Sequence, residues 1–236
     1  MFEKDYTLRY GDLNRKGNIR LGAILDVLQD VAGRHSSSLG YSSEFLYSKS
    51  IAWLLQGWRV RVLSALNYET PVTIKTGIMN VKRFTSERKY EMWQNGELKV
   101  IATADWFTVD IDKLKPIIVP KEILENYESI NEESNDLPFI KLRPEVETEF
   151  VKELKVEDRD LDQNQHVNNA KSAEILSDGL FDSSVLSEIL ITYRKAVMPE
   201  NKMLIYRTKQ DFGYYMELKN ENNEPCVLMQ IVYKKG

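Results

Sequence analysis

The chain has 236 residues, of which 42% are hydrophobic and 29% are charged, and its 32 Lys and Arg against 36 Asp and Glu give a net charge of -4. This length allows one large domain or two small ones, and the net charge argues against a general nucleic-acid binder, which needs a basic surplus for phosphate contacts. The single cysteine, Cys226, excludes an intrachain disulfide, and two histidines, His35 and His166, disfavour a His-rich metal site. We therefore expect no nucleic-acid partner, no metal and no organic cofactor.

The sequence carries no targeting or membrane signal that we can identify. Its first ten residues, MFEKDYTLRY, are too charged for a secretory signal. The longest apolar run, Ile51 to Leu55, is far shorter than the ~20 residues that a membrane span needs. These features favour a cytoplasmic protein without membrane insertion.

The first strong helical signal runs from Leu21 to about Leu39, where apolar residues recur at helical spacing, and Gly40 stands where such a helix would stop. The apolar stripe consists of Leu21, Ile24, Leu25, Leu28 and Ala32. A helix with one apolar stripe is expected to bury that stripe against the rest of the fold.

Strand-like segments follow this helix. From Trp53 to Leu63, apolar residues alternate with Arg59 and Arg61, which predicts a half-buried strand with its arginines outward. Asn95-Gly96 is typical of a tight hairpin turn. The other alternating runs of this half are Val72–Ile78, Arg88–Trp93 and Leu98–Val109.

The segment from Asp112 to Glu149 differs from its surroundings, since it contains four prolines and the polar stretch from Asn131 to Asp136. This composition predicts a connector, with a short helix near Ile123. The earlier order of elements then returns, with a helix from Asn169 to about Phe181 and a last turn at Asn222-Asn223. Strands are predicted at Ile189–Lys195, Met203–Lys209, Gly213–Lys219 and Cys226–Tyr233.

Two similar loops precede the two long helices. Asp12, Asn14 and Asn18 match Asp162, Asn164 and Asn168 at an offset of 150 residues, with Lys16 in the first copy at the place of His166 in the second. Together with the shared order of elements, this match predicts two copies of one unit, each a loop, a long helix and an antiparallel sheet. Three polar matches alone could also arise by coincidence.

The second loop carries the residues best suited to chemistry. A helix start offers unpartnered N–H groups and partial positive charge, which would stabilise the oxyanion that develops on an ester or thioester carbonyl. Asn168 and Asn169 are candidate N-caps, and His166 is the natural general base near neutral pH. Asp162 could orient the imidazole or help activate water, and Asn164 could hold a carbonyl or a water. On residue types alone, an ordinary turn, in which Asp and Asn bind nearby backbone, explains the same cluster and is the commoner case.

The stretch from Asp160 to Asn169, DLDQNQHVNN, resembles the signature of the acyl-acyl-carrier-protein thioesterases, which hydrolyse fatty acyl thioesters. The segment from Asp5 to Gly40 and the strand around Trp53 and Trp58 also resemble the first half of that family. The resemblance implies an α+β tandem hotdog fold, with an N-terminal hotdog at residues 1–135, a connector to about residue 149, and a C-terminal hotdog at residues 150–236. It also implies that Asp162, Asn164 and His166 occupy the catalytic positions of the family.

Two departures from the family pattern stand out. The family often has Tyr-Arg-Arg/Lys-Glu in a strand after the second helix, whereas this chain has Tyr193-Arg194-Lys195-Ala196, and the nearest Glu is Glu200. The family also usually has a Tyr shortly after the final Asn pair, where this chain has Ala170 to Ala173. Either change could alter the rate or the substrate.

Because Lys16 cannot act as a base without a large fall in its pKa, we expect one functional site per chain. The resemblance then assigns the acyl chain to the first hotdog. The candidate tunnel residues are Leu25, Leu28 and Gln29 on the first helix, and Trp53, Trp58, Met79, Met92 and Trp93 on its sheet. Ordinary core packing is the alternative for each of them.

The expected partner is an acyl carrier protein that carries a fatty acyl chain. Such a carrier is acidic, so a basic face would speed the encounter, although a solvated strand exterior explains the same charges. The candidate basic residues are Arg59, Arg61, Lys82, Arg83, Arg88, Lys89, Arg194 and Lys195.

Three functions remain open at this stage: hydrolysis of acyl-carrier-protein thioesters, hydrolysis of coenzyme A thioesters by the same fold, and non-catalytic acyl binding, which Ala196 motivates. Because two units in one chain already form a pair, the chain could work as a monomer or as a homodimer.

Overall fold

The structure is a computed structural model that describes residues 1–81, 84–113, 115–127, 137–144, 147–200 and 202–234. Lys82 and Arg83 of the candidate basic face and the polar stretch from Asn131 to Asp136 lie outside these residues. Among the helices so described, none has the length and apolar character that crossing a bilayer requires.

The first half of the chain forms a long helix and an antiparallel sheet. Its elements are β1 (Phe2–Tyr6), α1 (Leu21–Ser38), α2 (Ser43–Ser48), β2 (Ile51–Val62), β3 (Val72–Val81), β4 (Thr85–Gln94), β5 (Glu97–Asp110), β6 (Lys115–Pro116) and α3 (Lys121–Glu125). The helix from Leu21, the strands and the short helix near Ile123 are confirmed, and Asn95 and Gly96 have the positive φ values, 52° and 74°, of a tight hairpin turn.

The second half repeats this order. Its elements are β7 (Glu149–Lys155), α4 (Asn169–Leu176), β8 (Leu186–Tyr193), β9 (Lys202–Gln210), β10 (Gly213–Lys219) and β11 (Pro225–Tyr233). The four predicted strands are confirmed, but α4 ends at Leu176 rather than near Phe181. A turn follows it, in which Gly179 has φ +76°, a conformation that glycine adopts at no steric cost.

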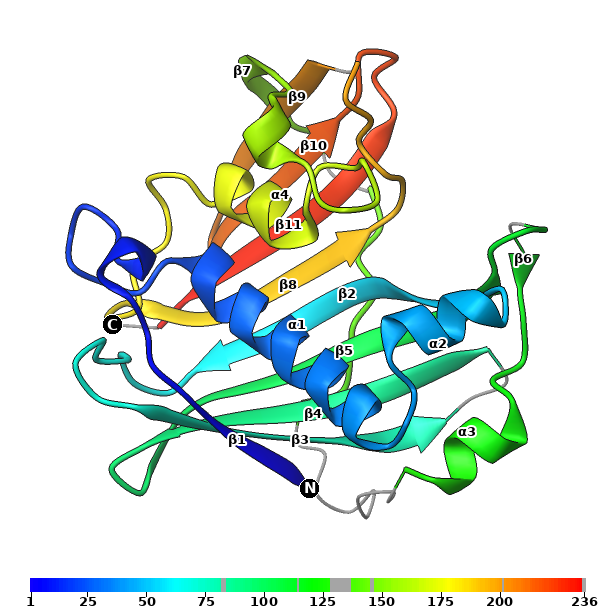
Figure 1. The fold of residues 1–236 in the computed structure, drawn as a ribbon. Helices are drawn as coiled ribbons and strands as arrows, with labels where there is room; N and C mark the ends of the chain where they lie inside the picture. The colour runs from blue at the N-terminus through cyan, green and yellow to red at the C-terminus, as the bar shows by residue number, and fades with distance from the viewer. Residues whose placement is uncertain (82–83, 114, 128–136, 145–146, 201, 235–236) are drawn as a thin grey trace.

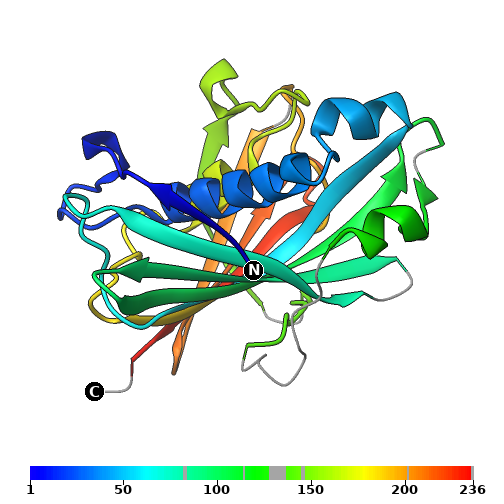
Figure 2. The same cartoon turned by 60° about the horizontal axis from the view of Figure 1, so that its bottom comes forward.

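The two halves share one continuous sheet, in the order β1-β3-β4-β5-β2-β8-β11-β10-β9-β7 with β6 paired to β5. β2 and β8 pair antiparallel at its centre, from Gly57 opposite Thr192 to Arg61 opposite Glu188. The order on one side of this pair mirrors the order on the other. Figures 1 and 2 show α1 lying along one face of the sheet, and Figure 1 shows α4 on the same side, where it packs on β10 and β11. The α+β tandem hotdog architecture is confirmed.

The helix α1 is held by its apolar stripe. Leu21, Ile24, Leu25, Leu28 and Val31 are at most 2% exposed and belong to a core that runs through both halves. At the start of α1, Arg20 forms an ion pair with Glu174 of α4 at 2.5 Å. The two helices therefore contact each other as well as the sheet.

The joint between the halves contains two of the candidate basic residues. Arg59 and Arg61 of β2 both bind the carboxylate of Glu188 on β8, at 2.8 and 2.9 Å. Their side chains are only 14% and 33% exposed. Gly57 lies beside them, and a Cβ added there would collide with the carbonyl of Ile191. These two arginines therefore hold the halves together.

Candidate functional site

The two similar loops have the same backbone structure, but the structural offset between them is 148 residues and not 150. A 3-10 turn ends at Asp12 in the first copy and at Asp160 in the second. Leu13 bridges Ile19, and Leu161 bridges Val167. The sequence-based register was therefore wrong by two residues.

Matching side chains hold the two loops in shape. In the first copy, the amides of Lys16 and Asn18 donate to Oδ1 of Asn14, at 2.9 and 3.1 Å. In the second, the amides of Asn164 and His166 donate to Oδ1 of Asp162, at 2.8 and 3.4 Å. Gly17 and Gln165 both have positive φ values, 79° and 62°.

This register changes which residues correspond. Asn18 takes the place of His166, and Lys16 takes the place of Asn164. The expectation that the first copy has no base at the His166 position still follows, because an asparagine side chain does not accept a proton near neutral pH.

Asp162 contacts the loop backbone in this structure. Its Oδ1 accepts the two amides of its own loop, and no hydrogen bond between its carboxylate and the His166 ring is found among the described residues. The His166 side chain is half-buried. The three predicted catalytic residues thus share one loop, with Asp162 shaping the backbone that carries the other two.

The start of α4 is capped by its own sequence. Oδ1 of Asn168 accepts the amides of Ala170 and Lys171, at 2.8 and 3.1 Å, as predicted for an N-cap. The amide of Asn169 remains as the N–H group at this helix start for which no acceptor is found within the described chain. A carbonyl placed here would have fewer amides available than the sequence suggested.

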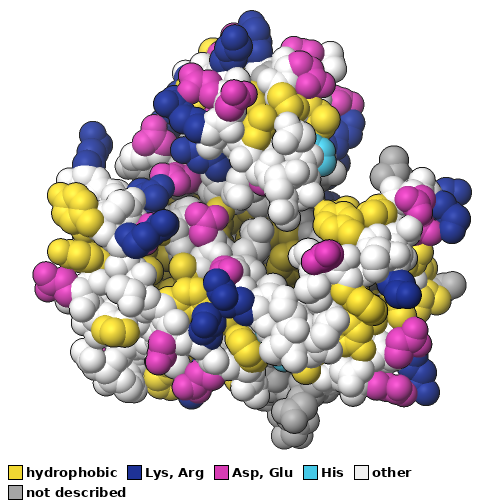
Figure 3. Space-filling view, viewed as in Figure 1, with side chains coloured by type: hydrophobic (Ala, Val, Ile, Leu, Met, Phe, Trp, Pro, Cys, Tyr) yellow, Lys and Arg dark blue, Asp and Glu magenta, His cyan; other side chains and the backbone are white. Residues whose placement is uncertain are grey.

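A cavity of about 660 Å³ lies beside this loop. Gln163 and Asn164 of the second half contribute to its wall. The rest comes from α1, α2 and strands β2 to β5 of the first half, together with Tyr41 and Tyr127. Figure 3 shows the molecule hollowed between its upper and lower lobes. The hydroxyl of Tyr47 on α2 donates to Oδ1 of Asn164 at 3.0 Å, which joins the halves at the cavity. His166 does not contribute to this wall.

The candidate acyl-chain residues separate into two groups. Gln29 and Trp53 lie on the cavity wall. The other candidates lie elsewhere: Leu25, Leu28, Trp58, Met79 and Met92 are at most 4% exposed, and Trp93 is half-buried with its Nε1 bound to Glu91. Core packing, the alternative considered for each, describes the positions of Leu25, Leu28, Trp58 and Met92.

The corresponding region at the first loop differs in size. A cavity of about 260 Å³ lies there, lined by Lys16 and Arg20 of the first half and by Glu174 and Phe181 of the second, among others. Lys16 forms an ion pair with Asp182 at 3.1 Å. The last turns of α1 line the larger cavity. Because α4 is shorter than α1, the smaller cavity has no corresponding helix turns in its wall.

The departures from the family pattern lie close to the second loop. The amide of Val167 donates to the carbonyl of Val197, at 2.9 Å, so the exposed Ala196 is next to a residue that pairs with the loop. No contact from Glu200 to the loop is found among the described residues. Two tyrosines from other elements contact this region. The hydroxyl of Tyr47 binds Oδ1 of Asn164, and the hydroxyl of Tyr193 binds the backbone carbonyl of Asn169.

Sequence reasoning missed several wall residues: Tyr47, Ser86 and Trp106 were not singled out, and Arg88 was considered only for a basic face. The alternation of Ser86 and Arg88 with Glu87 and Lys89 placed the first two on one face of a strand. Nothing in the sequence told which face would be turned toward a cavity.

Comparison with known families gives two adjacent matches. A model described as the acyl-ACP thioesterase N-terminal domain matches residues 1–127, and one described as the acyl-ACP thioesterase C-terminal domain matches residues 144–235. A comparison with curated protein sequences finds no match.

Solved structures match over almost the whole chain. They include an acyl-ACP thioesterase from Bacteroides thetaiotaomicron (17% identity, TM-score 0.84, covering 99% of this chain and 97% of that one). A putative oleoyl thioesterase from Lactobacillus plantarum has 17% identity and a TM-score of 0.87, with coverage of 99% and 96%. The 12:0-ACP thioesterase from Umbellularia californica has 15% identity and a TM-score of 0.83, with coverage of 99% and 96%. At these identities the likeness establishes the fold.

Proposed function

This chain belongs to the acyl-ACP thioesterase family and is thus a thioester hydrolase, and from that premise we propose that it releases a free acid from an acyl carrier protein at the loop of Asp162, Asn164 and His166. The observation that carries the proposal is the position of Asn164. This residue lies on the wall of the cavity of about 660 Å³ and belongs to the same loop as the histidine. An acyl group in the cavity would therefore end beside the loop that carries the proposed base.

The proposed reaction needs no protein nucleophile. His166 takes a proton from water, and the resulting hydroxide attacks the thioester carbonyl carbon. The carbon–sulfur bond then breaks, and the protonated imidazole returns its proton to the leaving thiolate. Asn164 holds the carbonyl or the water through its side-chain amide, and the amide of Asn169 faces the charge that develops on the carbonyl oxygen.

Asp162 has a positioning role in this proposal. Its Oδ1 fixes the backbone of Asn164 and His166, while its negative charge favours the imidazolium that forms when His166 accepts a proton. Both contributions depend on the same side chain, but only the second requires a carboxylate.

We further propose that one chain suffices for one site, whether it is a monomer or a homodimer, because Asn164 and Tyr47 come from the two halves of a single chain. The domain boundaries at residues 135 and 150 and the cytoplasmic location stay predictions.

The test is a panel of acyl carriers and matched coenzyme A thioesters of graded chain length, assayed for release of free acid. His166→Ala should reduce kcat by at least about a hundredfold, because a positioned general base contributes on that scale. Asn18→Ala is the matched control, since it removes the side chain at the equivalent place in the first loop, and should leave kcat unchanged. Full activity of His166→Ala would overturn the assignment of His166 as the general base. Faster hydrolysis of coenzyme A thioesters than of matched carrier-protein thioesters would overturn the preference for the carrier protein.

The alanine at position 196 allows a separate measurement. If the missing Glu limits the rate, Ala196→Glu should raise kcat. If wild type retains an acyl ligand without turnover and Ala196→Glu hydrolyses it, the natural chain binds acyl groups without hydrolysing them.

A further inference from the structure

The cavity in the first half has a strongly polar inner wall. Ser86 and Arg88 alternate along β4 on the same face as the core residues Tyr90 and Met92, and both line the cavity. They are only 2% and 6% exposed. A cavity built only for a hydrocarbon chain would be expected to carry apolar side chains at such positions.

Arg88 is held by neutral groups. Its guanidinium donates to Nδ1 of His35 at 2.9 Å and to Oγ1 of Thr76 at 3.4 Å, and it lies 5.6 Å from the centre of the Tyr127 ring. A guanidinium has only donors, so His35 accepts through Nδ1 and must be neutral in this contact. Burial, together with Arg88, lowers the pKa of His35 to about 4, in agreement with that geometry.

The positive charge of Arg88 has no carboxylate partner among the described residues. Two carboxylates line the same cavity, Asp26 and Asp30. Asp30 is already bound by Arg34 at 2.6 Å and by the hydroxyl of Tyr6 at 3.0 Å, and no ion pair joins Asp26 to Arg88. Burying an unpaired charge is costly, and a bound anion would offset that cost.

Three further polar atoms of the wall have no hydrogen-bond partner within the part of the chain that the structure describes. They are the hydroxyl of Ser86, Nε1 of Trp106 and Oε1 of Gln29. The first two can donate to a ligand oxygen, whereas Oε1 of Gln29 can only accept. Buried polar atoms are usually satisfied, so unsatisfied ones beside a cavity indicate a ligand that completes them. Ser86 and Arg88 are two residues apart on one strand face, so one oxygen-bearing group could contact both.

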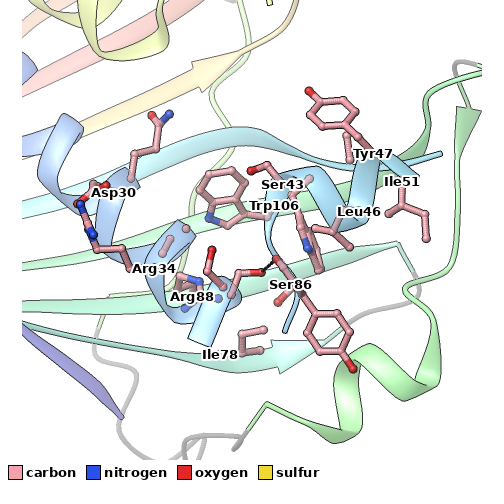
Figure 4. Close-up of a pocket in the computed structure, with 18 of the residues that line it drawn as sticks. Asp30, Arg34, Ser43, Leu46, Tyr47, Ile51, Ile78, Ser86, Arg88 and Trp106 are labelled. Atoms are coloured by element: carbon pink, nitrogen blue, oxygen red, sulfur yellow. Dashed lines mark hydrogen bonds and ion pairs between the residues drawn. The ribbon is translucent and has the colours of Figure 1, made fainter. Parts of the chain in front are cut away.

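We propose that the cavity accepts an acyl group that bears an oxygen acceptor, above all a carboxylate, at its far end, where Arg88 and Ser86 bind it. This inference rests on the proposed function, which places the thioester beside Asn164. In Figure 4, Tyr47, the partner of Asn164, and Arg88 lie on opposite sides of the cavity, so the acyl chain would run between them.

A plain hydrocarbon end would lack the acceptor that Arg88 and Ser86 need. Sites that hydrogen-bond a substrate group reject an analogue without that group, because their buried polar atoms are then left unpaired. We expect the acyl carrier with a terminal carboxylate to exceed the methyl-ended carrier of equal length by at least about tenfold in kcat/KM. A terminal hydroxyl should fall between them.

The test compares these three carriers on wild type, Arg88→Met and Arg207→Met. Arg88→Met should reverse the preference, since it replaces the charge with an apolar chain of similar length. Arg207→Met is the matched control, because Arg207 lies on β9 over the Tyr214 ring and not on the cavity wall; it should leave the ratio unchanged. A wild-type preference for the methyl end, or an unchanged ratio in Arg88→Met, would overturn the inference while hydrolysis itself continued.

A binding measurement keeps the inference testable apart from catalysis. The variant His166→Ala is titrated calorimetrically with methyl octanoate, whose far end is a methyl group, and with monomethyl octanedioate, whose far end is a carboxylate; the second should bind at least about tenfold more tightly. If Arg88→Met fails to fold, Ser86→Ala serves instead and should lower this preference by about fivefold, the value of one buried hydrogen bond. Equal affinities for the two esters would overturn the inference whether or not wild type hydrolyses thioesters.

Discussion

The hydroxyl of Tyr47 donates a hydrogen bond of 3.0 Å to the side-chain carbonyl of Asn164, across 117 residues of sequence and between the two halves of the fold. Tyr47 is held on α2 by a helix cap, in which Ser42 accepts the amide of Phe45, and by the buried Leu46. The bond fixes which end of the Asn164 amide is turned toward Tyr47. The NH2 end is thereby left for a substrate carbonyl or a water.

Replacing Tyr47 with Phe tests this positioning. The change removes one hydrogen bond, worth about 1 kcal/mol, so we expect kcat/KM to fall about fivefold. The melting temperature should hardly move, because Tyr47 is 44% exposed. Tyr10→Phe, at a side chain that is 80% exposed, is the control. Unaltered kinetics for Tyr47→Phe would show that the bond has no part in the reaction.

The contribution of Asp162 to the loop conformation can be tested separately from the contribution of its negative charge, because the first loop has an asparagine, Asn14, at the equivalent position. Asn14 makes the same two backbone bonds, so Asp162→Asn should keep the loop intact and remove only the charge. We expect a fall in kcat of at least about tenfold, with unchanged stability. Asp162→Ala should in addition lower the free energy of unfolding by about 1 kcal/mol. If Asp162→Asn were fully active, loop shape alone would be the contribution of this residue.

His35 should make stability depend on pH. Its folded pKa is lowered to about 4 from 6.5, first by burial and then by Arg88 and the N-terminal amine. Between these values the unfolded chain binds a proton that the folded chain does not, so unfolding is favoured as the pH falls. The free energy of unfolding should decrease from pH 6.5 toward pH 4, by an amount on the order of 3 kcal/mol.

Urea unfolding at a series of pH values checks this expectation, with His35→Gln as the comparison. Glutamine offers Arg88 a neutral acceptor and does not titrate, so part of the pH dependence should disappear. An NMR titration of the His35 ring should also show its pKa rising in Arg88→Met, because the guanidinium contributes to lowering it. The same pH slope in wild type and His35→Gln would contradict this account.

Glu188 should be important for the joint between the halves. Glu188→Gln leaves Arg59 and Arg61 without their shared carboxylate in a half-buried setting, so we expect a loss of about 1 to 3 kcal/mol in the free energy of unfolding. Glu125→Gln, which breaks an ion pair exposed by 87% and 63%, should cost less than about 0.5 kcal/mol. Chemical denaturation measures both. Equal costs would mean that the central pair contributes no more than a surface pair.

This role also bears on recognition of the carrier. Reversing the charge of Arg59 or Arg61 would disturb the β2–β8 joint, so a loss of activity in such variants would not by itself report a docking surface.

Much of the fold could be predicted because its main elements carry strong periodicity. The apolar stripe of α1 and the Asn95-Gly96 turn are determined by residues that are close together in the sequence, so they can be predicted without knowing the tertiary structure. The edge strands β1 and β7 were missed, since Phe2–Tyr6 and Glu149–Lys155 are short and charged, as exposed edges often are. The helix α2 was missed for its length of six residues.

The candidate site shows where sequence reasoning failed. Matching Asn14 to Asn164 by residue identity gave the wrong register, because Asn and Asp form the same backbone turn and either can stand at that place. The true counterparts, Asn14 and Asp162, differ in residue type but share their hydrogen bonds. The polar wall around Arg88 depends on how α1 lies across β4, which no local pattern encodes.

The unequal helices on the shared sheet have a consequence for adaptation. In a symmetric pair of separate identical chains, any change to one helix is made twice, so enlarging one chamber enlarges both. Here α1 has 18 residues and α4 has eight, and each is written independently in the gene. The cavity wall supplied by the first half can thus change while the loop of the second half, where we propose that the thioester is hydrolysed, is left untouched.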